Sequence, residues 1–263
     1  MNRRIWKDYV WGKQSLQQLS KAYNKSIPVI RKILDRAPLS EQKTLPKKVI
    51  LIADVTFFGR GYGILVCRSE KHQKNIYWKE VHNESPLQYL QARKEIERQG
   101  YTIEAIVLDG KRGIREVFSD IPVQMCQFHQ KAIVRRYLTQ NPRLPAAKEL
   151  WNIVQFLPTI RKEDFECLLS LWYSRWEGFL RERTYDEDGR HWHYTHRRVR
   201  SAYRSLRENL DFLFTHQKHP ELSIPNTTNS LDGSFGHMKT LLKNHRGVSK
   251  KRRFKMIEEI LGK

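Results

Sequence analysis

Strand-like and helix-like apolar patterns follow one another between residues 47 and 128 in an order that few folds satisfy. The expected strands are 47–56, 61–67, 76–81, 102–108 and 123–128, and the expected helices are 86–99 and 114–118. The first three strands are joined by short connections and can pair as an antiparallel meander, whereas strands joined through helices pair in parallel. The order therefore predicts a mixed five-stranded sheet with helices on its faces, in the α/β class.

Acidic residues close two strands of this predicted sheet, and a third acid begins a helix late in the chain. Asp54 ends the run Val-Ile-Leu-Ile-Ala-Asp, and Asp109 ends the run Ile-Val-Leu-Asp. Asp232 lies just inside an expected helix over 228–242. A carboxylate beside an apolar core is costly to keep charged unless a cation or hydrogen bonds share the site. Two or three such carboxylates together are a usual way to hold Mg²⁺ for phosphoryl transfer.

Each of these acids also has a purely structural explanation. Asp54 and Asp109 could simply cap the ends of their strands. Asn229 and Asp232 have the spacing of a helix capping box, in which an acid three residues after the N-cap stabilises the helix start. The residues alone leave both explanations open.

The charge of the chain is strongly positive. Its 49 Lys and Arg residues exceed its 28 Asp and Glu residues, which gives a formal net charge of +21. Nucleic acid is the commonest partner of such a surface, and a solvated basic surface is the alternative. No apolar run approaches the length of a membrane span and no signal-peptide pattern is present, so we expect a cytoplasmic protein without a membrane partner. The three scattered cysteines predict no disulfide.

The first 36 residues have the pattern of three short helices. A tight turn separates the second and third, and the third helix presents Arg31, Lys32 and Arg36 on one face. This is the plan of a helix-turn-helix, whose second helix enters the DNA major groove. A small helical packing module with a solvated charged face is the alternative. Residues 37–46 have the composition of a linker.

Helical spacing dominates from about residue 129 to residue 219, with a surface loop expected over 186–194. A row of arginines in this block is suited either to a DNA backbone, with Trp192 or Tyr203 stacking on a base, or to solvent; its members are Arg197, Arg198, Arg200, Arg204 and Arg207. We expect Trp172 and Trp176 in the core. After the last helix a basic tail is predicted. The expected units are 1–46, 47–134, 135–219 and 220–263, which are the helix-turn-helix domain with its linker, the first part of the core, a helical insertion, and the last core helix with its tail.

Acids that close the first and fourth strands of such a sheet are the layout of the ribonuclease H-like fold. With its motifs, the chain resembles transposases of prokaryotic insertion sequences in the Mutator-like DDE superfamily. The resemblance rests on Ala-Asp-Val-Thr-Phe-Phe-Gly around Asp54, Leu-Asp-Gly-Lys-Arg-Gly-Ile around Asp109, Cys-Gln-Phe-His at 126–129, and Thr-Thr-Asn-Ser-Leu-Asp-Gly at 227–233. These motifs occur in the family's order over roughly residues 48–250.

The resemblance implies metal-dependent cleavage at transposon ends and transfer of the 3′-hydroxyl strand to target DNA. Asp54, Asp109 and Asp232 would be the catalytic ligands of Mg²⁺, with Mn²⁺ as a substitute. Asp232 departs from the family, which usually has Glu at this point. The implied partner is double-stranded DNA, bound by a homodimer or higher oligomer in the prokaryotic nucleoid.

Further expectations concern residues around these acids. Lys239 and Lys243 are expected to contact DNA phosphates, with solvated helix lysines as the alternative. Cys126 and His129 are expected to be a structural or active-site-adjacent pair rather than a zinc site, because a structural zinc site needs four ligands. Two other functions stay open. One is a decayed or domesticated transposase that only binds DNA, and the other is a structure-specific nuclease.

Overall fold

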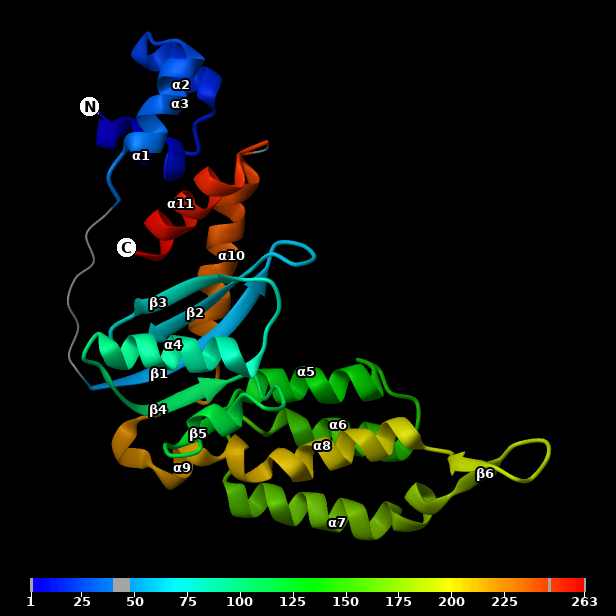
Figure 1. Cartoon of the computed structure of the whole chain (residues 1–263). Coiled ribbons are helices and arrows are strands. Elements are labelled where there is room, and N and C mark those ends of the chain that lie inside the picture. The colour runs from blue at the N-terminus through cyan, green and yellow to red at the C-terminus, as the bar shows by residue number, and fades with distance from the viewer. Residues whose placement is uncertain (1, 40–47, 246, 263) are drawn as a thin grey trace.

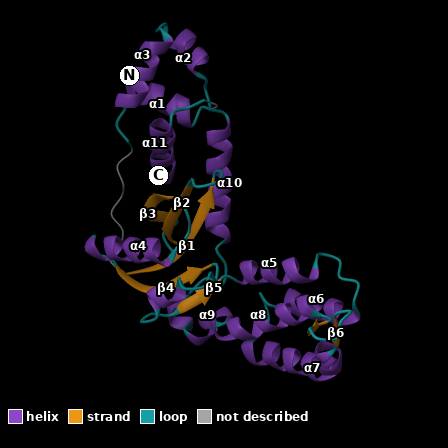
Figure 2. Cartoon of the chain, turned by 45° about the vertical axis from the view of Figure 1, so that its right-hand side comes forward, coloured by secondary structure: helices purple, strands orange, loops and turns teal. Residues whose placement is uncertain are grey.

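The computed structural model describes residues 2–39, 48–245 and 247–262. Three parts of the chain follow one another along the molecule (Figure 1). Small N-terminal helices lie at one end, the sheet lies in the middle, and a bundle of longer helices lies at the other end. Figure 2, turned by 45°, shows the same order.

The central sheet has five strands in the order β3-β2-β1-β4-β5. Their bounds are β1 Lys48–Phe57, β2 Gly63–Ser69, β3 Lys74–Val81, β4 Thr102–Leu108 and β5 Val123–Met125. β1, β2 and β3 form an antiparallel meander, while β4 and β5 continue the sheet in parallel. The predicted mixed five-stranded sheet is confirmed. β5 is shorter than the predicted 123–128, because the chain already enters helix α5 at Gln127.

The strands alternate their side chains between two faces of the sheet. Val49, Leu51 and Ala53 of β1 join a core with helix α4, Pro86–Arg98, and the 3₁₀ helix η1, Arg115–Phe118. Ile52 of β1 and Val107 of β4 point to the opposite face, where they pack in a core with helix α10, Asn229–Lys243. The sheet is therefore covered on both faces.

The N-terminal helices form a module that packs on the C-terminal helix. They are α1 Asn2–Val10, α2 Leu16–Tyr23 and α3 Ile27–Arg36, and the C-terminal helix is α11, Lys250–Leu261. Arg252 of α11 donates two 2.9 Å hydrogen bonds to the carboxylate of Asp35 in α3. Lys255 donates to the carbonyls of Leu34 and Asp35, where a helix end carries partial negative charge. The module is thus docked on the rest of the protein as well as linked to it. Most of the predicted linker, residues 40–46, lies outside the described residues.

The predicted basic tail is wrong for its last part, which forms α11. Met256, Ile257, Ile260 and Leu261 recur at helical spacing and are buried beneath the N-terminal module. The basic residues at the start of this helix hide that pattern in the sequence.

The helices between β5 and α10 form a block with a core of its own, to which Trp172 contributes as predicted. Its helices are α5 Gln127–Leu138, α6 Pro145–Gln155, α7 Lys162–Arg181, α8 Arg197–Leu213 and α9 Thr215–Lys218, followed by the 3₁₀ helix η2, Pro220–Leu222. The expected loop at 186–194 is wrong in part, because Arg183–Tyr185 and Trp192–Tyr194 pair as the hairpin β6–β7. Strands of three residues are too short for their alternation to stand out in the sequence. No described helix combines the length and apolar character needed to cross a bilayer.

Candidate metal centre

The register of the sheet brings Asp54 and Asp109 to one edge. β1 and β4 run parallel, with Ile52 opposite Val107 as the last pair. Two further steps of the same register bring Asp54 level with Asp109. Both residues also share the side-chain parity of Ile52 and Val107, so they face α10 rather than α4. The sequence suggests that Asp54 ends its strand, but the structure does not place it there. β1 continues to Phe57, and its last part pairs with β2 alone.

A third carboxylate, Glu84, joins these two. One oxygen from each of Asp54, Glu84 and Asp109 lies within 4.8 Å of the others. Glu84 comes from the loop between β3 and α4, and the sequence analysis missed it. The meander contains the signal that would have found it. β3 runs in the same direction as β1, so its end arrives at the same edge as Asp54.

Hydrogen bonds orient these three side chains. The backbone N–H of Val55 donates to Asp54 Oδ1 at 2.7 Å, and the N–H of Lys111 donates to Asp109 Oδ1 at 2.9 Å. The Tyr89 hydroxyl donates to Glu84 Oε1 at 2.7 Å. Lys111 Nζ donates to Glu84 Oε2 at 3.2 Å and to the Glu84 carbonyl at 2.7 Å. The acids are held in place before any ligand binds.

Asp54 is the carboxylate that most needs a cation. Its side chain is almost fully buried, and burial is the main cause that raises its pKa to about 7. The charges of Asp109 and Asp232 raise the pKa further, while His129 and the Val55 N–H oppose the rise. A divalent cation would reverse this effect, since a positive charge favours the ionised form. Carboxylate oxygens from three residues fit a hard cation such as Mg²⁺.

Asp232 lies outside this group of three. It occupies the first turn of α10, and its charge acts on Asp54. The N-cap of α10 is Thr228 rather than Asn229, and no side chain caps this helix start. The capping-box explanation of Asp232 is therefore wrong. Its Oδ2 instead accepts a long hydrogen bond, 3.4 Å, from the Thr228 hydroxyl.

Thr228 connects Cys126 and His129 with Asp232. The backbone N–H and the hydroxyl of Thr228 donate to Cys126 Sγ at 3.3 and 3.4 Å. Burial disfavours the Cys126 thiolate, but hydrogen bonds from His129 and Thr228 outweigh burial and lower its pKa. The bond with Cys126 is also the main cause that raises the pKa of His129 to about 9. Among the described residues, neither belongs to a group of three possible metal ligands.

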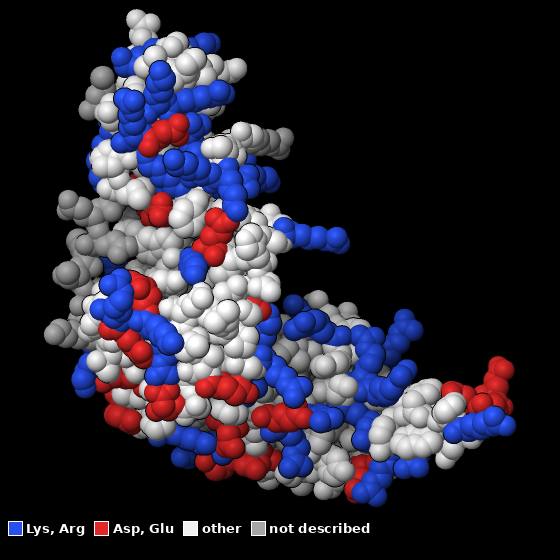
Figure 3. Space-filling model, in the orientation of Figure 1, with Lys and Arg blue, Asp and Glu red and all other residues white. Residues whose placement is uncertain are grey.

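The residues predicted to bind DNA lie on exposed helix faces. Arg31, Lys32 and Arg36 are exposed on α3, and Lys239 and Lys243 are exposed on α10. Figure 3 shows Lys and Arg side chains covering much of the N-terminal end of the molecule. The Lys239 ammonium lies 5.8 Å from the centre of the Phe58 ring. Contact of these residues with DNA stays a prediction.

Comparison with known proteins gives only distant likenesses. No protein-family model and no curated protein matches the chain. Among solved structures, a chain of the simian T-cell lymphotropic virus intasome in complex with PP2A regulatory subunit B56 gamma has 12% identity and a TM-score of 0.25. That match covers 60% of this chain and 69% of the other. The Drosophila P element transposase strand transfer complex has 12% identity and a TM-score of 0.36, with 100% and 78% covered. Both TM-scores lie below 0.5, so neither likeness carries an argument about this chain.

Proposed function

We propose that this chain is a DNA transposase that cuts and joins DNA strands with a divalent metal ion. In this proposal its sheet and insertion form a ribonuclease H-like core of the Mutator-like DDE superfamily. One observation carries the proposal. The carboxylates of Asp54 and Asp109 lie together with that of Glu84 at one edge of the sheet, and Asp54 is buried there with a raised pKa.

Asp54, Glu84 and Asp109 would hold one Mg²⁺, or Mn²⁺ in its place. Asp232, whose charge acts on Asp54 from the first turn of α10, would contribute to a second ion. Such ions supply Lewis-acid stabilisation of the phosphate oxygens and a lower pKa for bound water. The protein contributes fixed donors around them. The Val55 and Lys111 N–H groups orient the two aspartates, and the Lys111 ammonium places a positive charge beside Glu84.

Double-stranded DNA is the substrate that the charge of the chain supports. A net charge of +21 suits a polyanion, and the exposed Arg31, Lys32 and Arg36 of α3 would read or grip the major groove. Lys239 and Lys243 would contact DNA phosphates. Two copies of the chain would work on paired ends.

Cleavage of labelled DNA that carries the element's own ends, in Mg²⁺ or Mn²⁺, tests the proposal. We expect Asp54→Asn and Asp109→Asn each to slow cleavage by about 10³-fold or more, because each removes a ligand of the cation. Asp120→Asn is the matched control. Its carboxylate is paired with Arg93 away from the three acids, and cleavage should stay within about twofold of wild type.

The same cleavage assay decides whether Glu84 or Asp232 is the third essential acid. Glu84→Gln and Asp232→Asn are compared, with Asp232→Glu as a test of whether the shorter side chain limits the rate. Cleavage that survives Asp54→Asn would overturn the proposal. Absence of cleavage in both metals, with tight and salt-sensitive DNA binding, would contradict it in favour of a protein that only binds DNA.

A further inference from the structure

One face of α8 carries a row of arginines that lines three cavities, of which one shares residues with each of the other two. Arg197, Arg200, Arg204 and Arg207 are spaced by three or four residues, so they share one side of the helix. A cavity of about 510 Å³ is lined by all four, a second of about 330 Å³ by Arg207, and a third of about 770 Å³ by Arg204. Shared side chains connect the cavities along the helix.

The four guanidinium groups have few acidic partners, although Glu166 and Asp211 line the 330 Å³ cavity together with Arg207. Arg197 and Arg207 have no ion-pair partner within residues 2–39, 48–245 and 247–262. Arg200 donates to the carbonyl of Leu180 at 2.6 Å, and its guanidinium lies 3.5 Å from the centre of the Tyr194 ring. Arg204 alone is paired with an acid, the exposed Glu208. The lining of the 510 Å³ cavity contains no acid, and besides its arginines it has three tyrosines, Tyr173, Tyr194 and Tyr203.

Through Arg204, this row reaches a cavity that extends to the loop after Asp109. The 770 Å³ cavity is lined by Gly110, the residue that follows Asp109, and by Arg112 and Arg115. Arg115 is half-buried, donates to the Asn209 side chain at 2.8 Å, and lies 4.3 Å from the centre of the Phe212 ring. Its close partners are thus uncharged. Glu116 and Glu208 also line this cavity, so its net positive charge is smaller than that of the 510 Å³ cavity.

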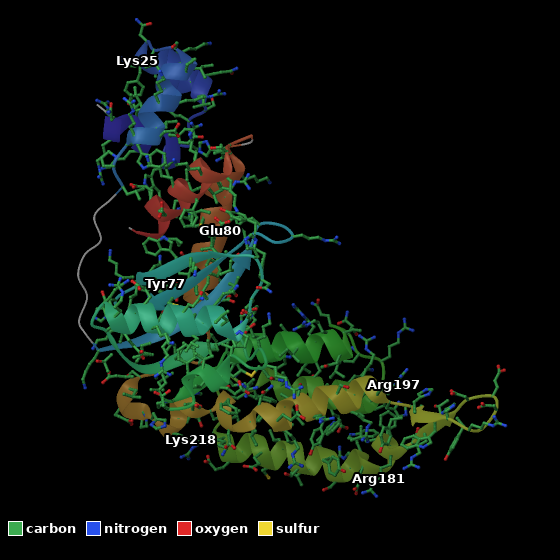
Figure 4. The ribbon with its side chains drawn as sticks, in the orientation of Figure 1. Lys25, Tyr77, Glu80, Arg181, Arg197 and Lys218 are labelled. Atoms are coloured by element: carbon green, nitrogen blue, oxygen red, sulfur yellow. The ribbon has the colours of Figure 1, made fainter. Side chains whose placement is uncertain are left out.

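The outer end of the row meets exposed aromatic rings. Tyr185 and Trp192 are direct partners in the hairpin β6–β7, and they are 58% and 43% exposed. The guanidinium of Arg183 lies 3.9 Å from the centre of the Trp192 ring. Figure 4 shows Arg197 at the end of α8 from which this hairpin projects. Arginine and exposed aromatic rings therefore continue beyond the helix.

We propose that the α8 arginine row binds a single-stranded DNA segment that adjoins the acidic centre. Arginine contacts to phosphates and stacking of bases on aromatic rings are how proteins hold single strands. Each cavity has the size of a small-ligand site, which suits one or two nucleotides and is too small for a duplex. Arg197 and Arg207 are about 15 Å apart along the helix, a length over which a strand presents several phosphates. The inference rests on the proposed function only for the identity of the substrate as DNA.

Binding of a fluorescent 20-nucleotide single strand, and of the duplex with the same sequence, tests this inference in EDTA with the full chain. The test variant is Arg197→Gln with Arg207→Gln. The control is Lys71→Gln with Lys94→Gln, which removes the same charge from exposed residues of the β2–β3 turn and α4. We expect the test variant to bind the single strand about tenfold more weakly. The slope of log K against log salt should fall by about 1.4, because two phosphate contacts are lost. The control variant should keep the wild-type slope.

Two further outcomes decide the inference. Trp192→Ala should weaken single-strand binding by about tenfold while leaving duplex binding unchanged, since stacking needs an unpaired base. The inference would be overturned if the arginine variant kept the wild-type salt dependence of single-strand binding. It would also be overturned if the salt dependence of duplex binding fell by the same amount. Because no metal is present, failure here is separate from failure of cleavage. A chain that cuts DNA without this binding pattern refutes the α8 site alone, and a chain with the pattern that never cuts refutes the proposed function alone.

Discussion

Two acidic residues of this protein have opposite surroundings, and the contrast separates a structural acid from a functional one. Asp120 follows η1 and is held by Arg93 of α4, which donates to its Oδ1 at 2.6 Å and also pairs with Glu97. The hydrogen bond from Arg93 lowers the pKa of Asp120 to about 2. Among the described residues Asp54 forms no salt bridge, and burial raises its pKa to about 7.

The difference shows where the fold leaves charge unbalanced. Around Arg93 the protein supplies its own cation, so the ionised acids there support the fold. At the sheet edge three carboxylates converge, and the positive charge that lowers the pKa of Asp54 is that of His129. An arrangement that costs stability without a ligand is typical of a functional site. In the proposed function, a divalent cation would supply the missing positive charge.

Of the substitutions that test this difference between Asp54 and Asp120, Asp54→Asn in the metal-free protein should change the free energy of unfolding most. The folded-state pKa of Asp54, about 7, lies above its ordinary value of 3.8, so the folded protein holds this proton more tightly than the unfolded chain. That contribution to stability is complete below pH 4 and is lost as the pH rises to 7. At pH 8 we expect Asp54→Asn to raise the free energy of unfolding by up to about 4 kcal/mol.

Denaturant unfolding at pH 4 and pH 8 in EDTA measures this effect. The gain should vanish at pH 4, where the wild-type carboxyl is protonated. Asp120→Asn should behave in the opposite way and lose less than about 1 kcal/mol at pH 8, because its ion pair is exposed. A destabilised Asp54→Asn at pH 8 would mean that the sheet edge already satisfies its own charge.

A smaller effect is expected from the turn that places Asp109. Gly110 has a φ of +89°, and a Cβ there would lie 2.4 Å from Met125 Cε. We expect Gly110→Ala to destabilise the protein by about 2 kcal/mol, from backbone strain and from displacement of Met125. Gly100→Ala is the control, since Gly100 has a φ of +87° with open space around it and should lose only about 1 kcal/mol. Thermal or denaturant unfolding measures both variants. If Gly110→Ala and Gly100→Ala lose the same free energy of unfolding, the Met125 side chain moves aside without cost, and the position of Asp109 does not depend on it.

Much of the fold could be predicted from the sequence because its strands have clear apolar patterns. The same patterns identified Asp54 and Asp109, since each acid interrupts a run that would otherwise stay buried. Glu84 could not be found in this way. It lies in a loop, and its approach to Asp54 depends on the direction of β3 relative to β1, which is a property of strand pairing.

Other predictions failed because they depend on contacts between segments far apart in the sequence. The apolar residues of α11 are preceded by the basic run Lys250–Arg253, so the segment has the composition of a tail until the N-terminal module supplies its packing partner. The N-cap of α10 is set by Thr228, whose N–H and hydroxyl contact Cys126 over a separation of 102 residues. Contacts this distant in sequence leave no periodic pattern.

The most direct test of the central claim is a titration of the full chain with Mn²⁺ at pH 7.5, followed by calorimetry or electron paramagnetic resonance. We predict saturable binding by wild type and by Asp120→Asn. Asp54→Asn and Asp109→Asn should each weaken that binding by about 100-fold or more, since each removes a carboxylate ligand. Wild-type binding that both substitutions leave unchanged would contradict the claim that the sheet edge is a metal centre.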